Sequence, residues 1–240
     1  MHDTAMDGFQ EHGYRIAWRL TPSELRKVSE LRAEVFCREL RWTGSPDDRA
    51  ERDEFDADST HVAVLDEQSE LIGAVRMIRS GAPWMLDTVF SGLASVSGIM
   101  KGVDTAEASR LVVHRSWRGR RLNNGMRACD LIYKAAYVYC RAHEIRYLYM
   151  VISDVVIELM RRSGLPCQAI SAPWQMPDGV RAVTAVIDWN RIREIPYLAD
   201  WYESGWEVPR SMRPVGTRTG PVRSSTTRYG VPTIDVAAVG

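Results

Sequence analysis

The sequence predicts an α/β (α+β) fold in which helices pack on a mixed β-sheet. Three stretches carry apolar residues at helical spacing, and five shorter apolar runs have the length and flanking turn residues that are typical of strands. The predicted helices cover 21–40, 124–143 and 154–164, and the predicted strands cover 61–65, 71–78, 108–114, 147–152 and 180–189. The chain has 240 residues, of which 45% are hydrophobic and 26% are charged, so it can bury the core that this fold needs.

The first helix has the clearest signature in the sequence. Thr21 is the predicted N-cap, Pro22 occupies the first helical position, and Glu24 completes a capping box three residues after the cap. Apolar residues then recur at helical spacing to about Leu40. The residues that define this apolar face are Leu25, Val28, Leu31 and Val35.

The later elements alternate between strand and helix. After an acidic loop, the runs at 61–65 and 71–78 flank a polar turn and are predicted to form a hairpin. Residues 80–106 mix Gly, Pro and small residues, which is typical of a loop with short helices. The last predicted helix ends at Gly164, a suitable C′ residue because glycine adopts a positive φ without strain.

Composition restricts the class of protein. Lys and Arg together number 31, as do Asp and Glu, and a formal net charge of zero argues against a protein that coats nucleic acid. The four cysteines lie far apart without a C-x-x-C pair, so neither a zinc site nor a disulfide framework is predicted. The first residues form no apolar run and the most apolar stretch carries charges, so we expect a cytoplasmic protein without a signal peptide or membrane span.

The chain is predicted to divide into a folded domain over 1–207 and a flexible tail over 208–240. From Pro209 on, the sequence is rich in Pro, Gly, Ser, Thr and Arg and has almost no apolar periodicity. The arginines of this tail could contact an acidic partner, but a solvated linker is the simpler account.

One short stretch, "AEASRLVVHRSW", places polar residues beside an apolar strand. Glu107, Ser109 and Arg110 directly precede the apolar residues. Because strand side chains alternate between faces, Glu107 and Ser109 would share one face and Arg110 would point to the other. A carboxylate beside a buried strand is costly unless it is paired or used in chemistry. The stretch therefore indicates either an ion pair at a strand edge or part of a functional site.

These three residues belong to a longer pattern. It comprises Arg32, Phe36 and Trp42 in "RAEVFCRELRW", Asp53 and Asp56 in "DEFD", Arg76 in "GAVRMI", Phe90 in "DTVF", and Glu107, Ser109 and Arg110. In this order and at these gaps, the pattern resembles the acyl-homoserine-lactone synthases, the LuxI-type autoinducer synthases, over about residues 14–190. That family has the GCN5-related N-acetyltransferase fold. The resemblance therefore implies a three-layer α-β-α sandwich with a mixed, mostly antiparallel central sheet, and a catalytic role for the domain over 1–207.

The resemblance also implies the substrates. They would be S-adenosylmethionine and an acyl thioester on acyl carrier protein or coenzyme A, and the product would be a quorum-sensing signal. No cofactor or metal is implied, since S-adenosylmethionine is consumed. The residues placed around the S-adenosylmethionine pocket, or in the electrostatic cluster that closes it, are Arg32, Phe36, Trp42, Asp53, Asp56, Arg76, Phe90 and Arg110. Their chemistry agrees, because carboxylates and aromatic faces suit the cationic groups of this substrate and a guanidinium suits its carboxylate.

Glu107 and Ser109 would take the catalytic roles. The substrate amine is protonated at neutral pH and must lose a proton before it attacks the thioester. We expect burial to raise the pKa of Glu107, so that its carboxylate accepts this proton through a water molecule. Ser109 would orient substrate or water, although a strand hydroxyl that bonds only to backbone is an equally simple interpretation.

Two groups of residues are predicted to serve the acyl donor. Met150, Ile152 and Ser153 would line the acyl pocket. The R-x-x-G-x-G phosphate-binding motif of the parent fold family is replaced by "RGRRLN", with Arg121 and Asn123 at the glycine positions, which weakens a coenzyme A interpretation. The basic residues nearby are Arg115, Arg118, Arg120 and Arg121. They would form either a docking surface for an acidic acyl carrier protein or a solvated face.

Two other functions fit the same sequence features. An N-acyl amino acid synthase would acylate an amino acid without forming a lactone, and release of methylthioadenosine distinguishes the two reactions. A protein without catalytic activity could bind nucleic acid through residues 115–127 and the basic tail, and salt-dependent DNA binding would reveal it.

Overall fold

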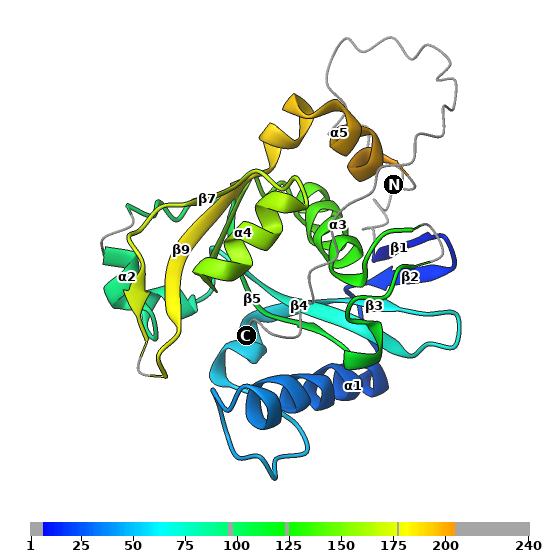
Figure 1. Ribbon diagram of the computed structural model, residues 1–240, viewed down its shortest axis with the longest axis horizontal. Helices are drawn as coiled ribbons and strands as arrows, with labels where there is room; N and C mark the ends of the chain where they lie inside the picture. Colours follow the sequence, from blue (N-terminus) through cyan, green and yellow to red (C-terminus); the bar gives the residue numbers. More distant parts are fainter. Residues whose placement is uncertain (1–6, 96–97, 123–124, 177, 205–240) are drawn as a thin grey trace.

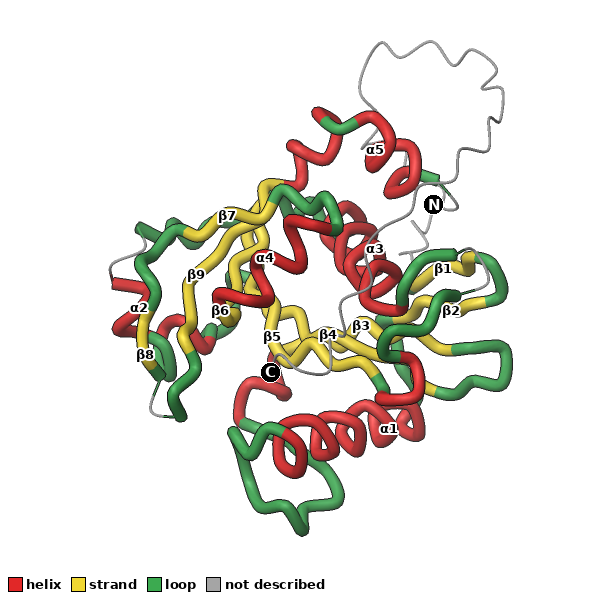
Figure 2. The backbone as a smooth tube through the Cα atoms, viewed as in Figure 1, coloured by secondary structure: helices red, strands yellow, loops and turns green. Residues whose placement is uncertain are grey.

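The computed structural model describes residues 7–95, 98–122, 125–176 and 178–204, which form one mixed sheet with helices on both faces (Figures 1 and 2). The strands are β1 (Gly8–Glu11), β2 (Tyr14–Ala17), β3 (Ser59–Leu65), β4 (Leu71–Arg79), β5 (Thr105–Val113), β6 (Tyr147–Ser153), β7 (Cys167–Ala169), β8 (Trp174–Gln175) and β9 (Arg181–Asp188). The α-helices are α1 (Pro22–Arg32), α2 (Ser91–Ser95), α3 (Ala128–Ala142), α4 (Asp154–Arg162) and α5 (Pro196–Glu203). The shorter helical segments are η1 (Ala33–Glu39), η2 (Glu54–Asp58), η3 (Met85–Asp87), η4 (Arg115–Trp117) and η5 (Trp189–Glu194). The predicted tail, Asn123 and Asn124 lie outside the described residues.

The sheet confirms the predicted three-layer sandwich. Its order is β1-β2-β3-β4-β5-β6-β9-β7, with β8 beside β9, and all described pairs are antiparallel except β5 with β6. Apolar residues of α1 and η1 pack on one face, and those of α3 and α4 pack on the other. Figure 1 shows the sheet between α1 below and the layer of α3 and α4 above.

The single parallel pair has a consequence for the site. Strands β5 and β6 pair over three positions only, from Thr105 with Tyr147 to Glu107 with Tyr149. Beyond this point β5 continues with β4 and β6 continues with β9, so the two strands diverge (Figure 2). Glu107 is the last β5 residue that pairs with β6, and Ser109 follows it where the strands have separated.

The predicted capping box begins α1. Thr21 accepts a hydrogen bond from the N–H of Glu24, and the Glu24 carboxylate accepts one from the N–H of Thr21 at 2.8 Å. The helix then changes to π-helical bonding over η1, where Leu40 N–H donates to the carbonyl of Val35. The predicted helical span to about Leu40 is therefore confirmed.

Replacing this cap should lower stability by a measurable amount. Thr21→Ala removes the acceptor for one helix-terminal N–H group, and we expect a loss of about 1 kcal/mol in the free energy of unfolding. Chemical denaturation measures this loss. Ser23→Ala, an exposed change within the same first turn, is the control and should not reduce stability. Equal stability of the two variants would contradict the cap assignment.

The structure differs from the sequence predictions in four places. It contains a hairpin of β1 and β2 that the sequence does not predict, because each strand has four residues, too few for a periodic pattern. Leu25, placed on the buried face of the first helix, is 41% exposed. The helix predicted from residue 124 begins at Ala128, where Asp130 accepts from the Arg127 N–H and fixes the helix start. The strand predicted from residue 108 begins at Thr105, because β6 supplies partners for its first three residues.

All four cysteines, Cys37, Cys129, Cys140 and Cys167, are buried free thiols. Within the described residues, helices fall short of the length and apolar character that a membrane crossing requires. The same part of the chain holds no group of His, Cys, Asp and Glu side chains arranged to bind a metal ion.

Candidate active site

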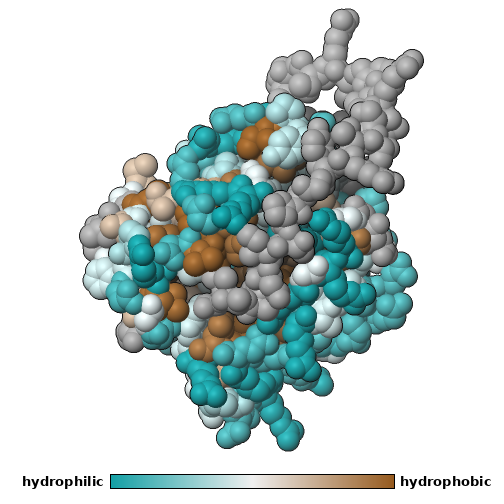
Figure 3. Space-filling model, in the orientation of Figure 1, coloured by the Kyte–Doolittle hydropathy of each residue, from teal (hydrophilic) through white to brown (hydrophobic). Residues whose placement is uncertain are grey.

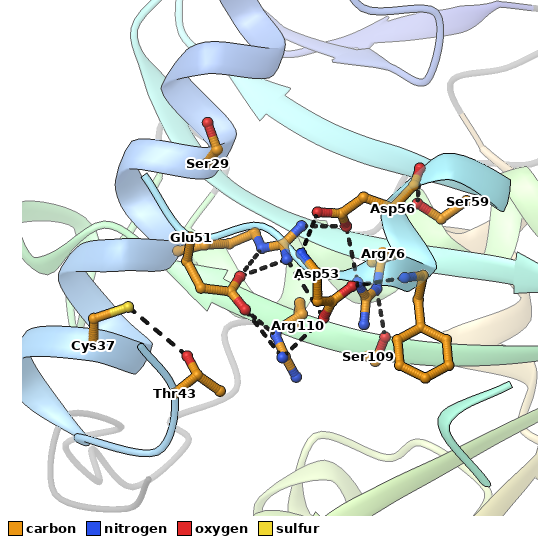
Figure 4. A network of polar contacts seen from close by, with 12 residues as sticks. Ser29, Cys37, Thr43, Glu51, Asp53, Asp56, Ser59, Arg76, Ser109 and Arg110 are labelled. Carbon is orange, nitrogen blue, oxygen red and sulfur yellow. Dashed lines mark hydrogen bonds and ion pairs between the residues drawn. The ribbon is translucent and has the colours of Figure 1, made fainter. Parts of the chain in front are cut away.

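An ion network joins α1, the loop before β3, β4 and β5 (Figure 4). Its members are the arginines Arg32, Arg76 and Arg110 and the carboxylates Glu51, Asp53 and Asp56. Three positive and three negative charges balance, so the network can be buried without net charge, whereas a missing partner would leave an uncompensated charge. The structure thus brings together six charged residues, five of which belong to the predicted site.

Arg32 and Arg76 approach the carboxylates from opposite sides. Arg32 donates from Nε to Glu51 at 2.5 Å and from Nη1 to Asp56 at 2.7 Å. Arg76 donates from Nη1 to Asp56 at 2.8 Å and to Asp53. Both guanidinium groups are buried, with 1% and 0% exposure. Burial opposes ionisation of Asp56, but its bonds with the two arginines outweigh this effect and lower its pKa to about 2.

The local sequence explains why the two aspartates are held in place. Asp53 is the N-cap of η2 and accepts from the Phe55 N–H at 3.1 Å. Asp56 reaches back to accept from the Asp53 N–H, also at 3.1 Å. Asp56 caps the turn with one oxygen and binds both arginines with the other, whereas the capping oxygen of Asp53 also binds Arg76 and its second oxygen binds Arg110. These bonds fix the orientation of both carboxylates.

The position of Arg110 corrects the prediction that it points to the other face from Ser109. Arg76 pairs with Ser109 and Ala74 pairs with Val112, so two residues of β5 oppose one residue of β4. This β-bulge places Arg110 at φ 52°, in the left-handed region. Arg110 therefore turns back to Asp53, to which Nη2 donates at 2.9 Å. Arg76 Nε donates to the Ser109 hydroxyl at 2.9 Å on the same side of the sheet.

Glu51 is a network residue that the sequence pattern does not predict. It is 5% exposed, and its carboxylate accepts from Arg32 at 2.5 Å and from Arg110 Nε at 3.0 Å. It lies in an acidic loop with Asp47, Asp48 and Glu54, and no local pattern distinguishes the buried acid from the exposed ones. Only a tertiary contact identifies Glu51, because its burial follows from the hydrogen bond between its N–H and the Ser29 carbonyl on α1.

Glu107 lies inside β5, whereas the strand predicted from the sequence begins one residue after it. Its side chain is 1% exposed, and its two carboxylate oxygens accept from the N–H groups of Met85 at 2.8 Å and Leu86 at 2.9 Å. Burial raises the pKa of Glu107 to about 7, against these two donors, which favour the ionised form. The sulfur of Met85 in turn accepts from Arg76 at 3.1 Å. Glu107 thus binds the backbone of the Met85–Leu86 turn, and the Met85 side chain links this turn to Arg76 of the ion network.

The aromatic residues of the pattern divide between two places. Phe36 stacks with Trp42 at a centroid distance of 6.1 Å, and the Arg110 guanidinium lies 5.2 Å from the Phe36 ring. Phe36 is buried in the core beneath α1, but Trp42 is 41% exposed. Phe90 packs instead in a separate apolar cluster with Trp84 and Met85. Phe36 and Trp42 therefore border the network, whereas Phe90 supports the turn behind it.

The residues predicted for the acyl pocket have structural contacts. Met150 is buried and Ile152 is partly buried in the core that α3 covers, and Ser153 accepts from the Val156 N–H at 3.2 Å as the N-cap of α4. A surface groove of about 530 Å³ lies next to them, but residues of α4 and β9 such as Val155, Ile157 and Val183 line it. Figure 3 shows hydrophobic residues gathered in this region, near α4 and β9. The acyl-pocket role of the three residues stays a prediction.

The predicted docking arginines are partly engaged within the protein. Arg118 is paired with Glu39 at 2.7 Å and donates to the Val113 carbonyl, with 13% of its side chain exposed. Arg115 is exposed and lies 3.6 Å from Glu34. Arg120 stacks over Trp117 and Arg121 donates to the Gly125 carbonyl, and both are exposed. Arg118 therefore contributes little to an open basic surface, whereas the other three can.

Comparisons with known proteins agree with the geometry. The sequence profile of the autoinducer synthase family matches residues 18–194. The acyl-homoserine-lactone synthase of Aeromonas salmonicida is 29% identical over 145 residues, which cover 60% of this chain and 70% of that protein.

Two solved structures show the same fold. The coenzyme A-dependent acyl-homoserine lactone synthase BjaI, with S-adenosylmethionine and isopentyl-coenzyme A, has a TM-score of 0.65 at 22% identity and covers 78% of this chain and 88% of its own. FeeM, an N-acyl amino acid synthase from uncultured soil microbes, has a TM-score of 0.56 at 16% identity and covers 78% of this chain and 97% of its own. Because the family profile spans most of the chain and contains the whole ion network, this protein belongs to the autoinducer synthase family, the family of the acyl-homoserine-lactone synthases.

Proposed function

We propose that this enzyme acylates the amine of S-adenosylmethionine from an acyl thioester and closes the product to an N-acyl-L-homoserine lactone, a quorum-sensing signal, with release of methylthioadenosine. The observation that carries the proposal is the buried, charge-balanced network with a stacked aromatic pair at its edge. Family membership supports the same reaction. Since both substrates are intracellular metabolites, we place the reaction in the cytoplasm.

The edge of the network offers groups that suit S-adenosylmethionine. The exposed face of Trp42 can receive the adenine ring or the sulfonium, because cations favour aromatic faces. The side chains of Asp53 and Arg110 are 19% and 12% exposed, so they can contact the substrate amine and carboxylate while they remain paired. Because the network is already fixed by internal bonds, little reorganisation is required when the substrate binds. S-adenosylmethionine is consumed, so the proposal requires no cofactor.

The first chemical step is acyl transfer. The deprotonated amine attacks the thioester carbonyl, a C–N bond forms, the C–S bond breaks, and the carrier leaves as a thiolate. The thiolate takes up the second proton that the nitrogen loses and becomes the free thiol. Glu107, with a pKa raised to about 7, can take the amine proton at neutral pH. Its oxygens also accept from Met85 and Leu86, so a water molecule would relay the proton. The Ser109 hydroxyl is held by Arg76 and can orient that water or the substrate.

The second step closes the ring. The carboxylate oxygen of the acylated intermediate attacks its own γ-carbon, a C–O bond forms, and the bond from that carbon to the sulfonium breaks. Methylthioadenosine leaves with the electron pair and is neutral. Because the attack is intramolecular and the leaving group is good, correct positioning of the substrate suffices.

The test is a donor panel. The protein is mixed with S-adenosylmethionine and a series of acyl-acyl carrier proteins and acyl-coenzyme A thioesters, and products are identified by mass spectrometry. We expect one or more donors to give both an acyl-homoserine lactone and methylthioadenosine. Absence of both products with every donor would overturn the proposal. An acylated amino acid without methylthioadenosine would favour an N-acyl amino acid synthase, the activity named for FeeM.

A further inference from the structure

His61 contacts the ion network but belongs to no part of the predicted site. It lies on β3 directly opposite Arg76 of β4. Its Nε2 is 2.8 Å from Arg32 Nη1 and 3.6 Å from the Asp56 carboxylate. Only 10% of its side chain is exposed. The exposed part borders a groove of about 550 Å³, whose lining includes Leu25 and Trp18. His61 therefore lines this groove next to Arg32 and Asp56, the two network residues that also reach it.

The chemistry of Arg32 determines the state of this imidazole. A guanidinium has N–H donors and no acceptor, so the Nε2 atom that faces it must be the acceptor. His61 then carries its proton on Nδ1 and is neutral. The charged groups that face it are Arg32 from α1, Arg76 from β4, and Asp53 and Asp56 from η2. Burial and the Arg32 charge lower the pKa of His61 to about 4, which agrees with a neutral ring at pH 7.

The contact gives the Nη1 atom of Arg32 its second acceptor, whereas the buried Nη2 atom makes no hydrogen bond and lies in an ion pair with Glu51 at 2.5 Å. Its Nε donates to Glu51, and its Nη1 donates to both Asp56 and His61. Without the imidazole, part of the Nη1 donor capacity would be left unsatisfied beside the groove, where the guanidinium could rotate away from Asp56. Asp56 also binds Arg76 and caps η2 through Asp53, so a shift of Arg32 would reach the edge of the network.

We infer that His61 is a positioning residue, a neutral hydrogen-bond acceptor that fixes Arg32 and thereby the carboxylates that receive S-adenosylmethionine. The kinetic part of this inference rests on the proposed function. In this role His61 does not contact the substrate. It differs from a core residue because Arg32 needs an acceptor atom at this position, and a side chain of the same volume without an acceptor would not suffice.

Two variants separate these roles. His61→Leu keeps similar volume without an acceptor, and we expect KM for S-adenosylmethionine to rise roughly tenfold, with KM for the acyl donor unchanged. His61→Gln retains an acceptor oxygen and should stay within about threefold of the parent enzyme. Leu25→Gln changes another residue that lines the same groove, is the control, and should change neither constant. Equal effects of His61→Leu on both KM values, or equal values for the Leu and Gln variants, would overturn the inference.

A second measurement does not depend on turnover. Long-range ¹H–¹⁵N NMR spectra of the full chain report which ring nitrogen of each of the five histidines carries the proton. The His61 signal is assigned by its loss in His61→Gln. We expect an unprotonated Nε2 and no titration between pH 8 and about pH 5. A proton on Nε2, or titration near the ordinary pKa of about 6.5, would contradict the inference even if the protein made a lactone. The expected spectrum in a protein that makes no lactone would uphold the contact and reject only the proposed function.

Discussion

Glu107→Gln is expected to lower kcat by about 10²–10⁴-fold, because an amide cannot accept the amine proton. The change keeps the size of the side chain and one acceptor oxygen for the N–H groups of Met85 and Leu86. Glu107→Ala should lose at least as much turnover. It would also leave both buried N–H groups without their partner, at a cost of about 1–3 kcal/mol each. Turnover and thermal unfolding are therefore measured on both variants.

The pH dependence gives a second, independent check on Glu107. A general base must be ionised, so with a pKa of about 7 the parent kcat should fall about tenfold per pH unit below pH 7 and level off above it.

The contribution of Glu107 to protein stability changes with pH in the opposite direction to its contribution to kcat. The pKa of Glu107 is higher in the folded protein than its ordinary value of 4.5, so its contribution to stability is fully present below pH 4.5 and is lost as pH rises through about 7. Compared with Glu107→Gln, the parent protein should become relatively less stable between pH 5 and pH 8.

A matched control is available on η2. Glu54 is an exposed carboxylate near the network, and Glu54→Gln should leave both kcat and its pH profile unchanged. If Glu107→Gln retained parental turnover, Glu107 would lose its role as base and keep only its bonds to the Met85 turn.

Glu51→Ala should cause a large loss of stability. It removes the carboxylate between Arg32 and Arg110 and leaves two nearly buried guanidinium groups with one partner fewer. Breaking a buried ion pair on one side costs roughly 3–5 kcal/mol. For a domain of this size, a loss of that magnitude corresponds to a decrease of roughly 10 °C in Tm. Differential scanning calorimetry measures it.

Glu70→Ala is the control for this experiment. Glu70 forms an ion pair with Lys27 at 2.8 Å, but its side chain is 66% exposed. Solvent screening limits such a pair to about 0–1 kcal/mol, so Tm should hardly change. A decrease for Glu51→Ala no larger than that for Glu70→Ala would show that the network contributes specificity of shape and not stability.

Much of the fold follows from local signals. The capping box at Thr21, the hairpin of β3 and β4, and the end of α4 at Gly164, which has φ 83°, are each predicted by a few neighbouring residues and are each found in the structure. Strands β1, β2, β7 and β8 have only two to four residues each. Their conformation is therefore determined more by packing against neighbouring strands than by their own sequence pattern.

The site, like the fold, contains some residues that the sequence predicts and others that only tertiary contacts identify. The order and spacing of Arg32, Asp53, Arg76 and Arg110 determine the chemistry that can gather, and the family follows from that order. Glu51 and His61 have no pattern of their own, because their burial depends on α1 and β4, which are distant in sequence.

The position of Arg110 shows most directly why part of the site cannot be predicted from the sequence. The sequence by itself determines which residue types stand in β5, and strict alternation would turn Arg110 away from Ser109. The tertiary structure adds a β-bulge, because the pairing of β4 with β5 shifts by one residue between Ser109 and Val112. A register shift depends on two strands at once, so neither strand alone encodes it. That shift brings the arginine into the network, where it binds Glu51 and Asp53.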